Sequence, residues 1–372
     1  MNEKTETRKR EHIETVLRED VSAKDVTTGF ERFFFEHIAV PELDLNDVDL
    51  STHILGHRLE APIFISSMTG GTEAARHINQ CLAEAAQHLG VAMGVGSQRA
   101  AIERPELSET YQVRDIAPDI LLFANLGAIQ LKHGYNVDHA RRAVEMIGAD
   151  ALFLHLNSLH EAVQVGGDCD WSDLLTAIER LVVELEVPVA IKEVGHGIGS
   201  QAARRLANCG VAAIDVAGAG GTSWTEVEAF RHTNPAAADV AHGFAGWGLP
   251  TALALIDSVS AVPEIPIFAS GGVRSGIDAA KAIRLGAALI GTAAPVLDDA
   301  TRTADAVRSH VSQMIEQLRI ASFCTGSTNL AALRRATLRR VTDWGIVEPL
   351  TANLPGVLDR PKQSRRQGSK HR

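Results

Sequence analysis

Residues 265–294 read IPIFASGGVRSGIDAAKAIRLGAALIGTAA, and this stretch decides the fold that the sequence predicts. The apolar run 265–269 is short and is followed by glycines, which is typical of a buried strand. A second buried strand is expected over 288–292, after a segment with helical spacing at 277–285. Two successive strand–glycine–helix units are typical of the last two strands of a (β/α)8 barrel.

The residues that follow these two strands indicate a phosphate site. Ser270-Gly271-Gly272-Val273-Arg274 follows the first strand, and Gly291-Thr292-Ala293-Ala294 ends the second. Glycines let backbone N–H groups turn toward an anion, and Arg274 adds a cation. The start of the helix after the glycines also favours an anion. In (β/α)8 barrels the loops after strands 7 and 8 commonly bind phosphate.

Upstream of this stretch, the chain repeats the same alternation of apolar runs and helix-compatible segments. Six further buried strands are predicted at 62–66, 91–95, 119–124, 151–154, 187–191 and 212–216. Continuous apolar runs are expected where a parallel sheet is covered by helices, so we predict an α/β fold, a (β/α)8 TIM barrel. A doubly wound open sheet is the alternative, but it would not place polar residues after every strand.

The remaining segments flank the barrel, which we place at 61–345. Residues 1–60 form an N-terminal extension with a helix over 1–20 and a β-ribbon over 50–59 that caps the barrel floor. A helix is predicted over 328–341, and the basic segment 346–372 is predicted to be a disordered C-terminal tail. The long loop 219–249, with Trp224 and Trp247, is expected to act as a lid.

Composition excludes several classes of function. The 372 residues carry a net charge of −10, which argues against a nucleic-acid partner. No apolar run approaches the roughly 20 residues of a membrane span, and the N-terminus MNEKTETRKREHIE does not resemble a signal peptide. The four cysteines contain no CxxC pair, which favours reduced thiols. We therefore expect a cytoplasmic protein.

Polar residues follow the predicted strands, on the face where barrel enzymes keep their sites. They are Met68, Thr69, Ser97, Arg99, Asn125, His155, Asn157, Lys192, Thr222 and Arg274. Lys192 would need an anionic partner in an apolar barrel mouth. That partner is either a carboxylate, such as Glu193 or Asp215, or the negatively charged edge of a cofactor such as a reduced flavin.

Two other clusters have open interpretations. His155, His160 and Glu161 could form a divalent-metal site, an acid/base group, or part of a surface loop. On the first helix, Arg8 and Lys9 lie near His12 on about one turn. They form either a solvated charged face or a cationic grip on an anionic ligand.

From Arg8 to about residue 345, the chain resembles the type 2, FMN-dependent isopentenyl-diphosphate isomerases. The motifs that carry the resemblance are Arg8-Lys9 with His12, Ser66-Ser67-Met68-Thr69-Gly70-Gly71, Gly94-Val95-Gly96-Ser97-Gln98-Arg99, Ala124-Asn125-Leu126-Gly127, His155-Leu156-Asn157, Lys192-Glu193-Val194-Gly195, Gly220-Gly221-Thr222-Ser223-Trp224 and Ala269-Ser270-Gly271-Gly272-Val273-Arg274.

The resemblance implies an isomerase that converts isopentenyl diphosphate to dimethylallyl diphosphate without net redox change. Reduced FMN would act as the acid/base, with NADPH as reductant, Mg²⁺ near Glu161, and homo-oligomers of four or more chains. The residues implied to hold FMN are Met68, Thr69, Ser97, Asn125, Lys192, Thr222, Gly272, Arg274, Ala293 and Ala294. The residues implied to bind or surround the diphosphate are Arg8, Lys9, Arg99, His155 and Asn157, which favours the cationic grip. The resemblance also allows Arg8 and Lys9 to serve a neighbouring subunit.

One departure from the family pattern concerns proton transfer. Where the family has glutamine, this chain has His160, and Val165-Gly166 replaces a Pro-Glu pair. A histidine can move a proton, and as a cation it would suit a diphosphate. We take His155, His160 and Lys192 as candidate catalytic residues. The alternatives are an FMN-dependent paralogue acting on a larger prenyl or carotenoid-like substrate, and a catalytically silent flavin-binding protein.

Overall fold

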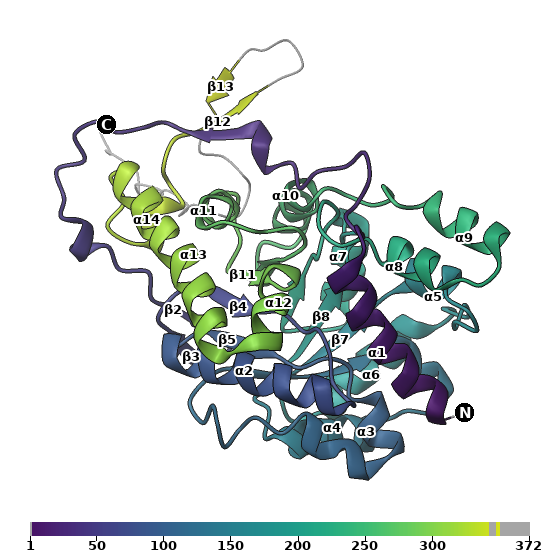
Figure 1. Ribbon diagram of the computed structural model, residues 1–372. Coiled ribbons are helices and arrows are strands. Elements are labelled where there is room, and N and C mark those ends of the chain that lie inside the picture. The colour runs from purple at the N-terminus through teal and green to yellow at the C-terminus, as the bar shows by residue number, and fades with distance from the viewer. Residues whose placement is uncertain (1, 342–346, 350–372) are drawn as a thin grey trace, which may run out of the picture.

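The computed structural model describes residues 2–341 and 347–349, and its centre is a closed barrel of parallel strands (Figure 1). The barrel strands, in chain order, are β4 (Ile63–Ile65), β5 (Ala92–Gly94), β6 (Leu122–Gly127), β7 (Ala151–Leu156), β8 (Val189–Glu193), β9 (Ala213–Asp215), β10 (Ile267–Ala269) and β11 (Leu289–Thr292). Each strand pairs with the next, and β11 pairs with β4 to close the ring. The predicted (β/α)8 barrel is therefore confirmed.

Helices cover the outside of the barrel. The main ones are α2 (Glu73–Leu89), α4 (Val137–Ile147), α6 (Leu174–Glu184), α7 (Ser200–Asn208), α10 (Thr251–Ala261), α11 (Gly276–Arg284) and α13 (Ala304–Cys324). The end signals of α2 are local: the Thr72 hydroxyl accepts the N–H of Ala75, and Gly90 ends the helix at φ 60°. The strand β5 is instead followed by short turns, α3 (Arg99–Glu103) and η3 (Pro105–Thr110).

Aromatic rings fill the lower part of the barrel. Phe64, Phe123, Phe153 and Phe268 point inward from different strands, and the rings of Phe123 and Phe153 stack at 4.2 Å. The hairpin of β2 (Thr52–Ile54) and β3 (His57–Leu59) adds side chains to the same buried cluster. The predicted β-ribbon at the barrel floor is thus confirmed, and the open mouth lies at the carboxyl ends of the strands.

The segments before and after the barrel pack onto it. Helix α1 (Asn2–Arg18) lies against α8 (Trp224–Arg231) and α12 (Ala294–Arg302), as Figure 1 shows. The predicted helix over 328–341 is wrong. Only α14 (Leu330–Leu333) is helical.

The rest of that C-terminal segment is extended. The strand β12 (Leu338–Val341) pairs with β1 (Phe33–Phe35) and with β13 (Val347–Pro349). Backbone pairing with a distant strand outweighs local helix propensity here. The predicted tail, 346–372, lies outside the described residues apart from β13.

The middle strands extend beyond their apolar runs. β6, β7 and β8 continue two or three residues further than predicted, so Asn125, His155 and Lys192 lie within strands and not after them. Backbone pairing continues where the side chains become polar, and an apolar-run criterion cannot detect this. His155 and Lys192 are direct neighbours across β7 and β8.

Two findings bear on the expectations from composition. In the described part of the chain, none of the helices has the length and apolar character needed to cross a membrane. All four cysteines are described, and all are free thiols.

Gly271 lies at a turn that only glycine fits, and its substitution gives a first prediction. Its φ is +97°, and a Cβ there would lie 2.1 Å from the carbonyl oxygen of Gly218. We expect Gly271→Ala to lower the free energy of unfolding by about 2–5 kcal/mol, from left-handed strain and overpacking. Gly134→Ala is the control, because Gly134 has φ +85° with nothing within 4 Å. Urea unfolding measures both, and equal losses would contradict the steric argument.

Candidate active site

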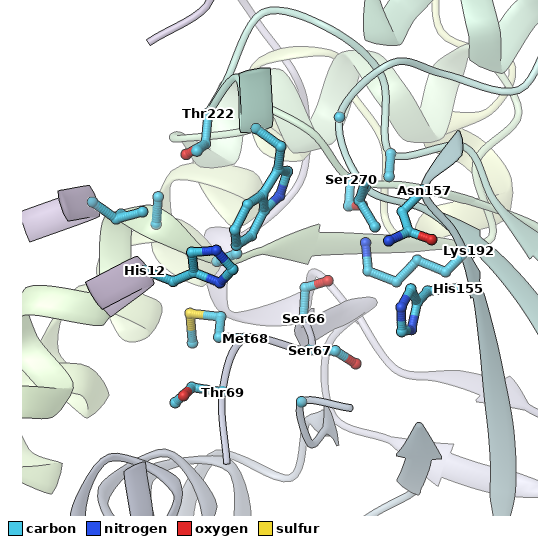
Figure 2. A pocket seen from close by; sticks show the side chains of 18 of the residues that line it. His12, Ser66, Ser67, Met68, Thr69, His155, Asn157, Lys192, Thr222 and Ser270 are labelled. Carbon is cyan, nitrogen blue, oxygen red and sulfur yellow. The ribbon is translucent and has the colours of Figure 1, made fainter. Parts of the chain in front are cut away.

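A cavity of about 280 Å³ opens at the carboxyl ends of the barrel strands (Figure 2). Every residue that the sequence predicted for the site lines it: Arg8, Lys9, Met68, Thr69, Ser97, Arg99, Asn125, His155, Asn157, His160, Glu161, Lys192, Thr222, Gly272, Arg274, Ala293 and Ala294. Figure 2 shows Met68, Thr69, His155 and Lys192 around one open space, with His12 facing them. The barrel therefore brings side chains from distant segments to one place.

One end of the cavity has the features of an anion site. Gly271 and Gly272 have φ values of +97° and +72° and line the cavity together with Arg274. Arg274 makes no hydrogen bond or ion pair with any described residue. Helix α12 begins beside these residues, and its Ala294 and Pro295 line the cavity. No residue of α11 lines the cavity, although the loop directly before that helix does, so the expected anion seat at the start of α11 stays a prediction.

Asn125 and His155 form a hydrogen-bonded pair in the cavity wall. The Nδ1 atom of His155 lies 2.8 Å from Oδ1 of Asn125. Burial, followed by the charge of Lys192, lowers the pKa of His155 to about 3, so the imidazole is neutral at neutral pH. A neutral ring that donates from Nδ1 leaves Nε2 as an acceptor.

Lys192 is buried next to a carboxylate. Its Nζ lies 3.4 Å from Oδ2 of Asp215 and donates to the backbone carbonyl of Glu193 at 2.9 Å. Of the two carboxylates that the sequence offered as partners, Asp215 is therefore the ion-pair partner. The Glu193 carboxylate instead accepts the backbone N–H groups of residues 194–196. Lys192 still lines the cavity, so it places a buried cation there whose charge is balanced by Asp215.

Several buried polar atoms beside the cavity lack partners among the described residues. They are the hydroxyls of Ser66, Ser67 and Thr292, and Oδ1 of Asn157. Buried polar groups are normally hydrogen-bonded, so these atoms indicate a polar ligand. Together with the Gly271–Arg274 anion site and Lys192, they fit the polar ring edge and phosphate of FMN.

The other side of the cavity is cationic and comes from α1. Lys9 donates to the carbonyl of Ser97 at 2.8 Å and contacts the hydroxyl of Tyr111 at 2.5 Å. Arg8 donates to Oε1 of Gln164 at 3.1 Å. Burial, followed by the charge of Arg8, lowers the pKa of Lys9 to about 7. The solvated-face interpretation is therefore wrong for Lys9, and both cations reach the cavity of their own chain.

Glu161 is the only carboxylate among the described residues that line the cavity. Its Oε1 accepts from Nδ2 of Asn157 at 2.8 Å, and its Oε2 accepts from Nε2 of Gln164 at 3.1 Å. These contacts orient the carboxylate on α5 (Ser158–Val163). Arg99 is also oriented, by a residue that does not line the cavity: its Nε donates to Glu103 at 2.8 Å. A single oriented carboxylate suits Mg²⁺, which keeps much of its water shell.

His160 does not stand free in the cavity. Its Nε2 lies 2.8 Å from Oε1 of Glu228, and its ring stacks on Trp224 at 4.9 Å. His12 makes a 2.8 Å contact with the same oxygen, and Arg231 binds Oε2 of Glu228 at 2.6 Å. Burial alone would raise the pKa of Glu228, but its hydrogen bonds with His12 and His160 hold that pKa well below its usual value.

Sequence reasoning missed several of these residues: Tyr111, Gln164, Glu228 and Arg231. Glu228 follows the cavity-lining Trp224 by four residues on one helix, and that spacing places both on one helical face. Trp247, the second tryptophan of the predicted lid, is 63% exposed and does not line the cavity. Whether the segment moves as a lid stays a prediction.

The fold and the cavity together define a class of flavin-binding barrel proteins. The chain belongs to the FMN-dependent dehydrogenase family, whose model matches residues 1–111 and 154–340. Within that family it groups with proteins named isopentenyl-diphosphate delta-isomerase. The one from Synechocystis sp. is 58% identical over 331 residues, which cover 89% of this chain and 95% of that protein. The one from Stutzerimonas stutzeri is 56% identical over 336 residues, which cover 90% and 97%.

Solved structures support the fold. A crystal structure of mandelate oxidase superposes with a TM-score of 0.61 at 19% sequence identity, covering 91% of this chain and 97% of that one. At this identity the similarity extends to the barrel architecture alone. The resemblance to the isomerases that the strand-end motifs predicted is confirmed by the sequence relatives.

Proposed function

We propose that this chain isomerises isopentenyl diphosphate to dimethylallyl diphosphate, with reduced FMN and Mg²⁺ and without net redox change. The observation that carries the proposal is that the cations of α1 and the single carboxylate Glu161 line the same cavity as the flavin-type strand ends. Cations and a Mg²⁺ ligand suit a diphosphate, and the opposite end suits FMN. Relatives named isopentenyl-diphosphate delta-isomerase, at 48–58% identity, support the same activity.

FMN, when bound and reduced, supplies the group that exchanges protons with the alkene. The residues of the chain would position the flavin and shield it from water. Lys192 would balance negative charge at the flavin edge, and the neutral His155, oriented by Asn125, offers Nε2 to the cavity. Arg8, Lys9, Arg99 and Asn157 would hold the diphosphate, and α1 with Trp224 would exclude water from the alkene.

His160 has a particular place in this proposal. It occupies the position of the family glutamine, and its Nε2 contacts the Glu228 carboxylate at 2.8 Å. A buried imidazole–carboxylate pair can accept and return a proton, so proton transfer at this position is chemically retained. A paralogue with a larger prenyl substrate, or a silent flavin protein, is not favoured, because the relatives over most of the chain carry the isomerase name.

Three further parts of the proposal concern partners and location. NADPH is the proposed reductant of FMN. A homo-oligomer of four or more chains is proposed from the family resemblance. A cytoplasmic location is proposed because all four cysteines are free thiols.

The proposed activity is tested in one anaerobic reaction. Purified protein is mixed with dithionite-reduced FMN, Mg²⁺ and isopentenyl diphosphate in D₂O, and the product is followed by NMR. We expect dimethylallyl diphosphate that carries deuterium from the solvent. If the protein binds FMN and leaves the substrate unchanged, the isomerase assignment is wrong.

The pKa of Lys9 gives a prediction for substrate binding. Because burial lowers that pKa to about 7, Lys9 loses its charge as the pH rises through about 7. One charged hydrogen bond contributes about 1.5–3 kcal/mol, so kcat/KM should fall about tenfold or more above this pH. Lys9→Arg keeps its charge and should lack this decline. The test is a pH profile of kcat/KM for the wild type and for Lys9→Arg. The same decline in both proteins would show that another group causes it.

A further inference from the structure

Three side chains that no part of the proposed activity uses as metal ligands meet at the edge of the cavity. They come from different elements: His12 from α1, His160 from α5 and Glu228 from α8. Nε2 of His12 and Nε2 of His160 each lie 2.8 Å from Oε1 of Glu228, and the three atoms all lie within 4.8 Å of one another. The cluster is largely buried, with Glu228 1% exposed.

This set of donor atoms has a known chemical preference. Two imidazole nitrogens and one carboxylate oxygen match the three protein ligands of open Zn²⁺ sites, which bind at about 2.0–2.2 Å. Mg²⁺ prefers oxygen ligands and would not select two imidazoles. The cluster is therefore chemically distinct from the Mg²⁺ position proposed at Glu161.

The surroundings hold the three ligands in place. Arg231 binds the other oxygen of Glu228 at 2.6 Å and also pairs with Glu11 at 2.8 Å, so its charge is shared between two carboxylates. The ring of Trp224 contacts His12 edge-on at 5.2 Å and His160 face-on at 4.9 Å. Outer partners of this kind orient ligands and strengthen metal binding.

We propose that His12, His160 and Glu228 form a binding site for Zn²⁺ or a similar first-row transition-metal ion. The imidazoles bind as neutral ligands, each with its proton on Nδ1. A bound ion therefore occupies Nε2 of His160 and Oε1 of Glu228 and blocks the proton transfer proposed for this pair. His12 and His160 line the cavity, so the fourth position of the ion faces the cavity and takes water or an oxygen atom of a bound ligand. His160 completes the site, because glutamine at this position would offer only an amide oxygen, a weak ligand for Zn²⁺.

The test measures metal binding and requires no turnover. The full chain, freed of metal with a chelator, is titrated with Zn²⁺ by calorimetry in excess Mg²⁺. We expect one Zn²⁺ per chain with two imidazole ligands in the zinc-edge X-ray absorption spectrum. His160→Gln and His12→Gln should each weaken binding by at least about 100-fold, because loss of a direct ligand should cost no less than the roughly 10- to 100-fold typical of an outer partner.

His242→Gln is the matched control. His242 Nδ1 contacts Oε1 of Glu226 at 2.8 Å, and Glu226 lies on the same helix as Glu228. Among the described residues, no third candidate ligand joins this pair. Its loss should leave Zn²⁺ affinity within about twofold. Equal affinity in the wild type and in His160→Gln, or no stoichiometric Zn²⁺ in the wild type, would overturn the proposal. Far-UV circular dichroism of each variant excludes misfolding as the cause of lost binding.

Discussion

Replacing Lys192 with methionine is expected to lower kcat by about 100- to 1000-fold, the loss typical of removing one preorganised electrostatic group. Lys192 is the buried cation that would balance negative charge at the flavin edge, and methionine keeps its length without its charge. The substitution also leaves the fully buried Asp215 without its ion-pair partner at 3.4 Å. We therefore expect the free energy of unfolding to fall by about 3–5 kcal/mol.

A double variant separates these two effects. Lys192→Met with Asp215→Asn removes both charges, and the hydroxyl of Ser270, which lies 2.8 Å from Asp215, can still pair with the amide. Stability should then return in part, while the isomerisation rate stays low. Bound FMN per chain is measured by absorbance, and rates are measured under reducing conditions. If Lys192→Met binds flavin fully and retains its rate within about tenfold, the proposed role of Lys192 is wrong.

Replacing Glu161 with glutamine is expected to lower activity by at least about 100-fold, since Mg²⁺ contributes several kcal/mol and each 1.4 kcal/mol is tenfold. Glutamine keeps the shape of the side chain but lacks the charge that Mg²⁺ requires. It also places an amide opposite two donors, Nε2 of Gln164 at 3.1 Å and the N–H of Asp168 at 2.9 Å. Activity is measured as a function of Mg²⁺ concentration, and saturation should disappear.

Glu226→Gln is the control for this experiment. Glu226 is 4% exposed, lies near the barrel mouth on α8, and does not line the cavity. Its substitution should leave the Mg²⁺ response unchanged. A normal Mg²⁺ saturation curve in Glu161→Gln would show that Glu161 is not the Mg²⁺ ligand.

Local sequence was sufficient for the barrel and for most of the site. The buried strands are covered on both sides, so each appears as a continuous apolar run. A parallel barrel brings the carboxyl ends of all its strands to one face, so residues such as Thr69, Asn125 and Lys192 meet although they are far apart in the chain. The floor hairpin was also predicted, because residues 50–59 alternate over a short turn.

Other features depend on partners that a local pattern cannot reveal. The segment Leu338–Val341 is a strand because it pairs with Phe33–Phe35, about three hundred residues earlier in the chain. The start of α12 also lines the cavity, and only the packing of the barrel mouth reveals this. The sequence also allowed Arg8 and Lys9 to serve a neighbouring subunit. In the folded chain, α1 instead places both side chains in the cavity of their own chain.

The sequence by itself determined the barrel, its strand-end groups and the resemblance to FMN-dependent isomerases, because each of these depends on short local motifs. The tertiary structure alone decided which groups share hydrogen bonds and therefore how they are charged. The pKa of Lys9 is lowered to about 7 because the folded chain buries its side chain and places it near the charge of Arg8. Glu228 lies between His12 and His160, which are 216 and 68 residues away in the chain. Burial and electrostatic contact depend on distance in space, and only the folded chain determines those distances.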